Sequence, residues 1–137
     1  VRLIDGKMDP AITHYELGKQ VVDHAHGEPL ELEPLISGAA LERRMAAKPA
    51  EIDDDKVWAA EEKYLAAGLY NTALYWNPAR IVIGGSMMRD IKISHVIREM
   101  EKLPDVFDAW PEVVLAKLGD EAGIRGCSAW LELLGYR

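Results

Sequence analysis

The chain is poor in cysteine, with Cys127 as the only one among its 137 residues. An internal disulfide needs two cysteines and a multi-cysteine zinc site needs several, so the sequence excludes both. A lone thiol is typical of proteins that work in a reducing compartment. We therefore expect a cytoplasmic protein without a cysteine-rich zinc site.

Long apolar runs and excess positive charge are also missing. No run approaches the roughly 20 residues that cross a bilayer as a helix, and the N-terminus lacks a signal-peptide pattern. The 16 Lys and Arg residues are outnumbered by 23 Asp and Glu, which gives a formal net charge of −7. Because a surface of that sign repels nucleic acid and anionic lipid, we expect no nucleic acid and no membrane as partner.

The composition is otherwise that of an ordinary globular protein, with 49% hydrophobic and 28% charged residues. A chain of this length can bury one core but not two independent lobes, so we expect a single domain over residues 1–137. The first residue is Val1 rather than Met. We therefore expect a fragment or a processed form of a longer protein.

The first third of the chain predicts short strands and one helix. Asp5-Gly6 lies between two short apolar runs, which is typical of a β-hairpin turn. We expect a further strand at 21–22, a polar loop over 24–33 and a helix over 34–47.

The remainder alternates helices with strands. An acidic run at 53–55 favours a helix start, and apolar residues from Val57 and Ala60 to Leu74 recur with a helical period. We expect helices over 53–76, 91–103 and 120–134, and strands over 80–83 and 113–118. This order predicts an α/β fold that contains a parallel strand pair.

The most informative segment is RIVIGGSMM at residues 80–88. Its aliphatic start is typical of a buried strand, and Gly84 and Gly85 allow a positive φ or a close backbone approach. Amides just beyond such a turn can bind phosphate or ribose. An ordinary strand-to-helix turn would use the same two glycines.

Three segments together resemble one family. They are EPLISGAA at 33–40, NPARIVIGG at 77–85 and LGDEAGIRGCSA at 118–129. In this order and spacing they resemble the C-terminal half of the ROK (repressor, open reading frame, kinase) sugar kinases. The resemblance implies an ATP-dependent, glucokinase-like hexose kinase. The implied fold is the C-terminal domain of a ribonuclease-H-like, actin-like ATPase, with a mixed sheet and packed helices, and with the N-terminal lobe absent.

The same resemblance implies four site residues. In these kinases the Gly-Gly turn lies against the adenosine side of ATP, which implies nucleotide binding by Gly84 and Gly85. A Glu-x-Gly-His motif and a later Glu hold the sugar, and they align with Glu16 and Glu33, although Lys19 replaces the histidine. Carboxylates suit this role because they accept hydroxyl hydrogen bonds. A surface glutamate at a strand end and a glutamate in a first helical turn are the alternative interpretations.

Other polar and small residues receive structural interpretations. Gly123 and Gly126, three apart near a helix start, predict close packing of the final helix on the sheet. His24 and His26 lie in the expected polar loop, where we expect them to be solvated rather than metal-bound. His14 and His95 show no partner by spacing and are expected at the surface.

Parts that kinase chemistry needs are missing. Phosphoryl transfer requires a phosphate cradle, Mg²⁺ and a base, and the family supplies the first and last from Asp-x-Gly-Gly-Thr and Asn-Asp-x-Asn-Ala motifs. Neither occurs here. The resemblance thus implies ATP, Mg²⁺ and a hexose as ligands, but no catalytic residue, so we expect no activity from the chain alone. The family's zinc loop corresponds to residues 25–32, which hold no cysteine, so we expect no zinc. An exposed sheet edge would favour a homodimer.

A different class of function also accounts for the sequence, namely a non-catalytic oligomerisation or interaction domain that retains the kinase scaffold. Its interface would use the numerous aromatic side chains, which are Trp58, Tyr64, Tyr70, Tyr75, Trp76, Trp110 and Trp130. An aromatic stripe at helical spacing is equally typical of a core. Regulatory ROK proteins carry a winged helix, which this acidic chain lacks, so we do not expect it to bind DNA.

Overall fold

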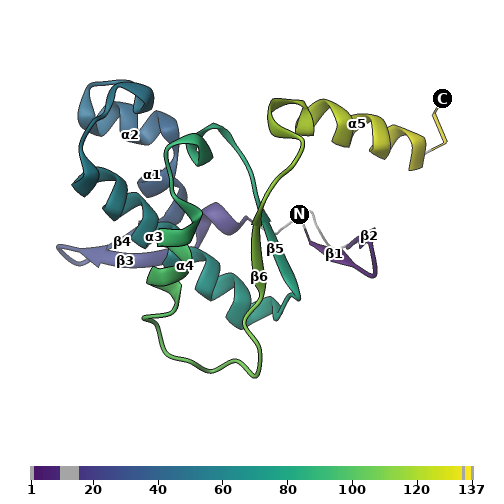
Figure 1. Cartoon of the computed structure of the whole chain (residues 1–137), viewed down its shortest axis with the longest axis horizontal. Helices are drawn as coiled ribbons and strands as arrows, with labels where there is room; N and C mark the ends of the chain where they lie inside the picture. Colours follow the sequence, from purple (N-terminus) through teal and green to yellow (C-terminus); the bar gives the residue numbers. More distant parts are fainter. Residues whose placement is uncertain (1, 10–15, 134, 137) are drawn as a thin grey trace.

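The computed structural model describes residues 2–9, 16–133 and 135–136. Its centre is a parallel strand pair, β5 (Arg80–Ile83) and β6 (Glu112–Leu115), in register from Arg80 opposite Glu112 to Ile83 opposite Leu115. Helices α3 (Asp55–Trp76) and α4 (Ile93–Met100) pack beside this pair (Figure 1). The predicted strand 80–83 is confirmed to the residue, and so is the parallel pairing.

The long helix α3 begins and ends where the sequence predicts. The Asp54 side chain accepts a hydrogen bond from the Lys56 amide at 2.9 Å, which satisfies one of the free donors of the first turn. At the other end Asn77 adopts a left-handed φ of 42°, and Pro78 prevents continuation.

The buried face of α3 differs from the predicted one. Ala60 and Leu74 are exposed, whereas Glu61 and Glu62 are buried. The reason is that α3 is covered on two sides, by α1 (Leu32–Ile36) and by α4, so that its buried surface is not one apolar stripe.

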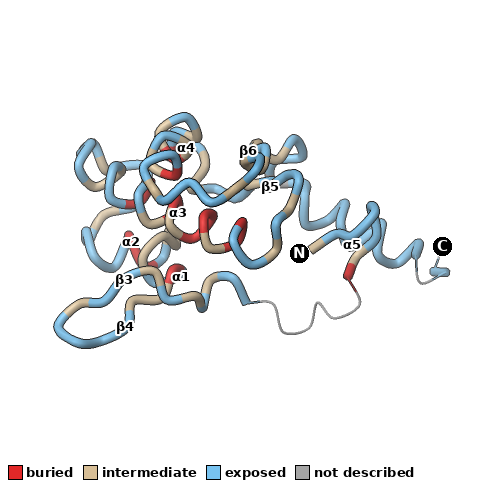
Figure 2. The backbone as a smooth tube through the Cα atoms, turned by 90° about the horizontal axis from the view of Figure 1, so that it is seen from below, coloured by how far each residue is buried: buried red, intermediate tan, exposed pale blue. Residues whose placement is uncertain are grey.

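The hydrophobic core lies between α3, α4 and one face of the strand pair. Its buried members are Leu65, Ala66, Leu69, Ile91, Val96 and Met100. Ile81, Ile83 and Val113 of the strands pack against this cluster from the side. Figure 2 shows the buried segments concentrated along α3 and the elements next to it.

Two antiparallel hairpins complete the strands. The first, β1 (Leu3–Ile4) with β2 (Lys7–Met8), has its turn at Asp5-Gly6 as predicted, with φ values of 50° and 74°. The second, β3 (Val21–Ala25) with β4 (Glu28–Glu31), replaces the predicted polar loop. That prediction was wrong because the hairpin is largely exposed, so its residues show no alternation of apolar and polar side chains.

The described residues therefore form three two-stranded sheets rather than the expected single mixed sheet. The predicted helix 34–47 is also divided, into α1 and α2 (Gly38–Met45). Ser37 separates the two because its extended backbone lets its Oγ accept a hydrogen bond from the Ala40 amide, 3.3 Å away, as a helix N-cap.

The final helix, α5 (Ala122–Leu133), has no buried residue and extends away from the packed helices (Figure 1). A Cβ atom added at Gly123 or at Gly126 would meet nothing within 4 Å. The predicted close packing of this helix on the sheet is therefore wrong in this structure. Among the described helices, none is both long and apolar enough to cross a membrane.

Candidate functional site

The glycine turn lies directly after β5, before a short 3-10 helix at Ser86–Arg89. A Cβ atom on Gly84 would lie 2.9 Å from the Cβ of Ala116, so a glycine is needed there for the chain that follows β6 to approach. Gly85 has a φ of 117°, which favours glycine, and a Cβ atom added there would meet nothing within 4 Å. Gly84 is thus explained by packing, whereas Gly85 leaves bare backbone beside open space.

Two cavities meet at this turn. One has a volume of about 390 Å³ and the other about 410 Å³, and both are lined by Gly84, Gly85 and Ser86. The first is also lined by Glu33 of α1, and the second by Gly119, the second residue of the LGDEAG segment. The fold thus brings three segments that are far apart in the sequence to the same turn.

Glu33 stands in the first turn of α1 with its side chain 60% exposed. Its position depends on Gly18, since a Cβ atom on Gly18 would lie 2.9 Å from the Glu33 Cβ. The backbone amide of Leu32 also donates to the Gln20 carbonyl at 2.9 Å. The segment ELGK and the start of α1 are therefore in direct contact.

Lys19 joins the carboxylates around this contact. Its Nζ donates to Glu31 at 3.2 Å and lies 3.9 Å from an oxygen of Glu33. The hydrogen bond to Glu31 and the charges of Glu31, Glu33 and Glu16 raise the pKa of Lys19. Each of these groups is exposed to water, so the ion pairs contribute little to stability, but they favour one arrangement of the side chains.

The two predicted sugar-binding glutamates line different cavities. Glu33 shares its cavity with Gly84 and Gly85, whereas Glu16 lines another of about 400 Å³, beside Tyr75 and Trp76. The structure therefore brings three of the four predicted site residues around one cavity, whereas Glu16 lines a different cavity together with Lys19.

Sequence reasoning missed two buried carboxylates on α3. Glu61 pairs with Arg44 of α2, and its second oxygen has no hydrogen-bond partner among the described residues. Burial raises the pKa of Glu61 to about 7, against the opposing effect of Arg44. The sequence feature that could have indicated these buried carboxylates is the pair of adjacent glutamates within a largely apolar helix.

The neighbouring carboxylate, Glu62, is buried against α4. It accepts a hydrogen bond from the Lys92 amide at 2.9 Å and lies 3.1 Å from Nδ1 of His95. The prediction that His95 has no partner is therefore wrong, because its partner lies 33 residues away in sequence. His14 is outside the described residues.

The residues at the glycine turn fit one of the ligands that the family resemblance implies, the nucleotide, but not a metal ion. Bare backbone at Gly85 beside the cavity shared with Gly119 fits the phosphate or ribose of a nucleotide. No carboxylate of the described residues lines that cavity, so these residues do not fit a Mg²⁺ site of their own. Across the described part of the chain, no three His, Cys, Asp or Glu side chains gather as metal ligands.

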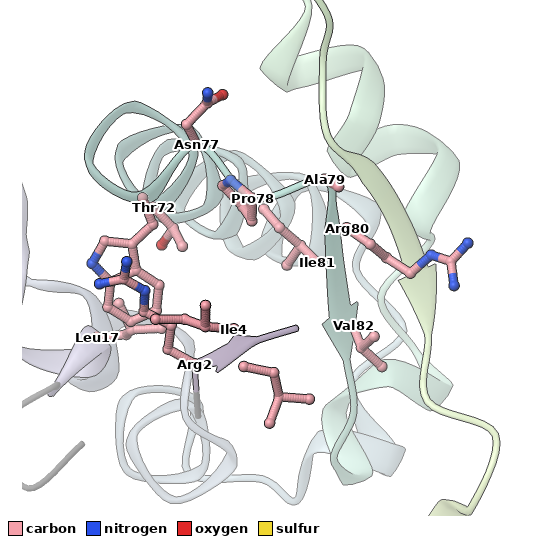
Figure 3. Close-up of a pocket in the computed structure, with 12 residues that line it drawn as sticks. Arg2, Ile4, Leu17, Thr72, Asn77, Pro78, Ala79, Arg80, Ile81 and Val82 are labelled. Atoms are coloured by element: carbon pink, nitrogen blue, oxygen red, sulfur yellow. The ribbon is translucent and has the colours of Figure 1, made fainter. Parts of the chain in front are cut away.

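A larger cavity, of about 590 Å³, lies elsewhere (Figure 3). It is bordered by hairpin β1–β2, the C-terminal end of α3 and the edge of β5 that β6 leaves free. Leu3, Ile4, Leu17 and Val82 give it an apolar lining, with Arg2 placed 5.8 Å from the ring centroid of Trp76. Among the described residues that line it there is no carboxylate, histidine or cysteine, and the Thr72 hydroxyl already donates to the Gly68 carbonyl at 2.8 Å.

The known proteins that this chain resembles in sequence and in structure belong to one family. A candidate fructokinase from Bacillus subtilis is 29% identical over 91% of this chain and 46% of its own length. The fructokinase of Pediococcus pentosaceus is 28% identical over 83% of this chain and 45% of its own length. The chain thus spans about half the length of these curated relatives.

A solved structure extends the likeness to the fold. The crystal structure of a ROK hexokinase from Thermus thermophilus superposes with a TM-score of 0.70 at 25% identity, covering 88% of this chain and 48% of that one. The expected fold class, part of an actin-like ATPase, is confirmed. The model of the ROK family matches residues 8–133. The chain therefore belongs to the ROK family.

Proposed function

We propose that residues 1–137 form a single domain equivalent to the C-terminal half of an ATP-dependent hexose kinase. In this role the chain contributes nucleotide and sugar contacts and is inactive alone. The observation that carries the proposal is the glycine turn between two cavities, one of which is lined by Glu33. A donor and an acceptor of a phosphoryl group need adjacent sites of this kind.

In this proposal the nucleotide occupies the cavity between Gly85 and Gly119. The backbone at Gly85 has no side chain to hinder its approach. The 3-10 helix Ser86–Arg89 begins directly after Gly85 in the sequence. Backbone amides at the start of a helix attract phosphate oxygens. The metal ion would accompany the nucleotide and be bound by groups outside the described residues.

The hexose occupies the neighbouring cavity, where Glu33 accepts hydrogen bonds from sugar hydroxyls. A carboxylate in this role discriminates against analogues that lack the hydroxyl, because an oxygen that the bound sugar covers would be left unpaired. Glu16 contributes through Lys19, whose ion pairs with Glu31 and Glu33 fix the local arrangement of charge. Lys19 replaces the family histidine, so sugar preference is expected to differ from that of members that retain the histidine.

Phosphoryl transfer itself needs a base for the attacking hydroxyl, and the chain lacks the family motif that provides one. We therefore propose that activity requires the lobe that carries this base. The expected location is the cytoplasm.

The test is the thermal unfolding midpoint of the chain with a panel of hexoses and, separately, with Mg-ATP. A ligand that binds only the folded state stabilises it by about 2.7 kcal/mol at 100 times its dissociation constant. Glu33→Ala should weaken hexose binding by about 10- to 100-fold, since a hydrogen bond to a charged group is lost, while the shift with Mg-ATP persists. Glu132→Ala, on exposed α5, is the matched control and should retain both shifts. The absence of any shift in the parent chain would refute the proposal.

A second candidate is a homodimeric interaction domain, and the exposed apolar surface favours it. Tyr75 is 84% exposed and Ile124 is 78% exposed. Other aromatics belong to the interior, because Tyr70 donates to the Pro104 carbonyl at 2.8 Å and packs against Phe107 and Trp110. Light scattering of the purified chain separates the candidates, since this one predicts a dimer mass without any response to ligands.

A further inference from the structure

We propose that Arg44 is a positioning residue for Glu33, which it orients by fixing helix α1 to the core helix α3. The proposal rests on the function proposed above, in which Glu33 contacts the hexose. Arg44 itself lies on α2 and lines neither cavity at the glycine turn. Its effect on the sugar would be exerted through α1.

Helix α1 cannot hold its own conformation. It has five residues, far fewer than the roughly 12 that an isolated helix needs in water. Its last carbonyl groups have no helical partners of their own. The orientation of Glu33, in the first turn, therefore depends on what holds the helix from outside.

The N-terminal end of α1 is held by packing. The side chain of Leu32 lies in a groove on α3, since a Cβ atom on Gly68 would lie 2.5 Å from its Cδ2. The Leu32 amide donates to the Gln20 carbonyl. These contacts fix the N-terminal end of α1, and at the other end Ile36 packs against the core cluster.

The C-terminal end is held by Arg44. Its Nη1 donates to the Pro34 carbonyl at 2.8 Å, and its Nη2 donates to the Leu35 carbonyl at 2.8 Å. The same Nη2 also donates to Glu61 of α3. One planar guanidinium thereby connects the end of α1 to the core helix, and only arginine has the donor geometry for this.

The surroundings of Glu61 indicate that the Arg44–Glu61 pair contributes more to the position of α1 than to the stability of the fold. The Glu61 carboxylate is only 2% exposed, and one of its oxygens has no hydrogen-bond partner in the described part of the chain. A buried ion pair is often no more stabilising than apolar side chains of similar volume. The position of Glu61 is better explained by the direction in which it holds the guanidinium of Arg44.

The experiment compares Arg44→Met with Arg43→Met, a neighbouring exposed arginine as matched control. Arg44→Met should raise the hexose dissociation constant about 10-fold and leave that of Mg-ATP within about 2-fold, because a small displacement of a contact group is costly. Arg43→Met should change neither. Equal weakening of both ligands by Arg44→Met would overturn the proposal, since it would indicate general loss of structure.

A double variant separates position from stability. Arg44→Met with Glu61→Met removes the unpaired buried carboxylate, so the unfolding midpoint should recover while hexose affinity stays about 10-fold weakened. Recovery of the affinity together with the midpoint would contradict a positioning role. Glu61→Gln, which retains an acceptor for Arg44, should bind hexose within about 2-fold of the parent.

Amide exchange tests the same claim without a sugar. The Ser37 amide donates to the Glu33 carbonyl at 2.9 Å, at the end of α1. Arg44→Met should accelerate exchange there by about 10-fold, beyond any change at core amides of α3. If the parent binds no hexose, the proposed function fails, but unchanged exchange at Ser37 would separately refute the positioning of α1.

Discussion

The two faces of strand β5 differ sharply. On one face Ile81 and Ile83 pack against α3 and α4, and on the other Val82 is 60% exposed. Helix α5 and hairpin β1–β2 lie to the right of the strand pair in Figure 1, and no residue of α5 is buried. One half of this domain therefore buries its apolar side chains within the chain, whereas the other half presents exposed apolar surface that is available for contact.

The largest expected effect contrasts the core with α5. Met100, which is 2% exposed, and Ile124, which is 78% exposed, are both large apolar residues. Met100→Ala should lower the free energy of unfolding by about 2–5 kcal/mol, because it leaves a cavity, and Ile124→Ala should change it by less than about 0.5 kcal/mol. Urea unfolding measures both. Comparable losses would mean that α5 is packed in solution.

The next effect is a pH dependence of the packed half. The pKa of Glu61 rises from 4.5 to about 7 on folding, because the carboxyl group is buried. The native state therefore binds the proton more tightly, and the stability this provides is full below pH 4.5 and lost as pH rises through 7. The loss should reach at most about 3 kcal/mol, and Glu61→Gln should abolish it. A parent and variant with parallel pH profiles of stability would contradict the assignment.

The smallest effect compares two glycines. Gly85→Ala places a side chain at a φ of 117° and should destabilise the chain by about 1–2 kcal/mol, besides weakening nucleotide binding. Gly123→Ala on α5 meets no neighbour and should improve helix propensity, with little change in global unfolding. Thermal unfolding with and without Mg-ATP distinguishes the two. A destabilising Gly123→Ala would show that α5 does pack closely.

Local chemistry made part of this structure predictable. The ends of α3, at the caps Asp54 and Asn77, were predictable because a helix cap depends on residues that are neighbours in sequence. The Asp5-Gly6 turn follows from the same kind of local preference. Strand 80–83 was predictable because an aliphatic run ends there at glycines. The family resemblance added what no local rule gives, namely the prediction of a sugar contact at Glu33 and of a nucleotide contact at Gly85.

The missed features depend on partners that are distant in sequence. The Arg44–Glu61 pair spans 17 residues and Glu62–His95 spans 33, so no local pattern indicates that these glutamates are buried. The break at Ser37 was missed for a different reason, since a serine inside an apolar pattern resembles a tolerated helix residue. The glycine spacing in α5 predicts close packing, but in this structure the helix has no buried residue, and a Cβ atom at Gly123 or Gly126 would meet nothing within 4 Å.

The central claim is that the glycine turn separates a nucleotide site from a sugar site. The most direct test is a pair of NMR titrations of the isotope-labelled chain, one with a hexose and one with Mg and a non-hydrolysable ATP analogue. We expect the hexose to shift the amide signals of Glu33 and Ser37, and the analogue to shift those of Gly85 and Gly119. Shifts confined to Leu3, Ile4 and Val82 around the cavity of about 590 Å³, or no shifts at all, would contradict it.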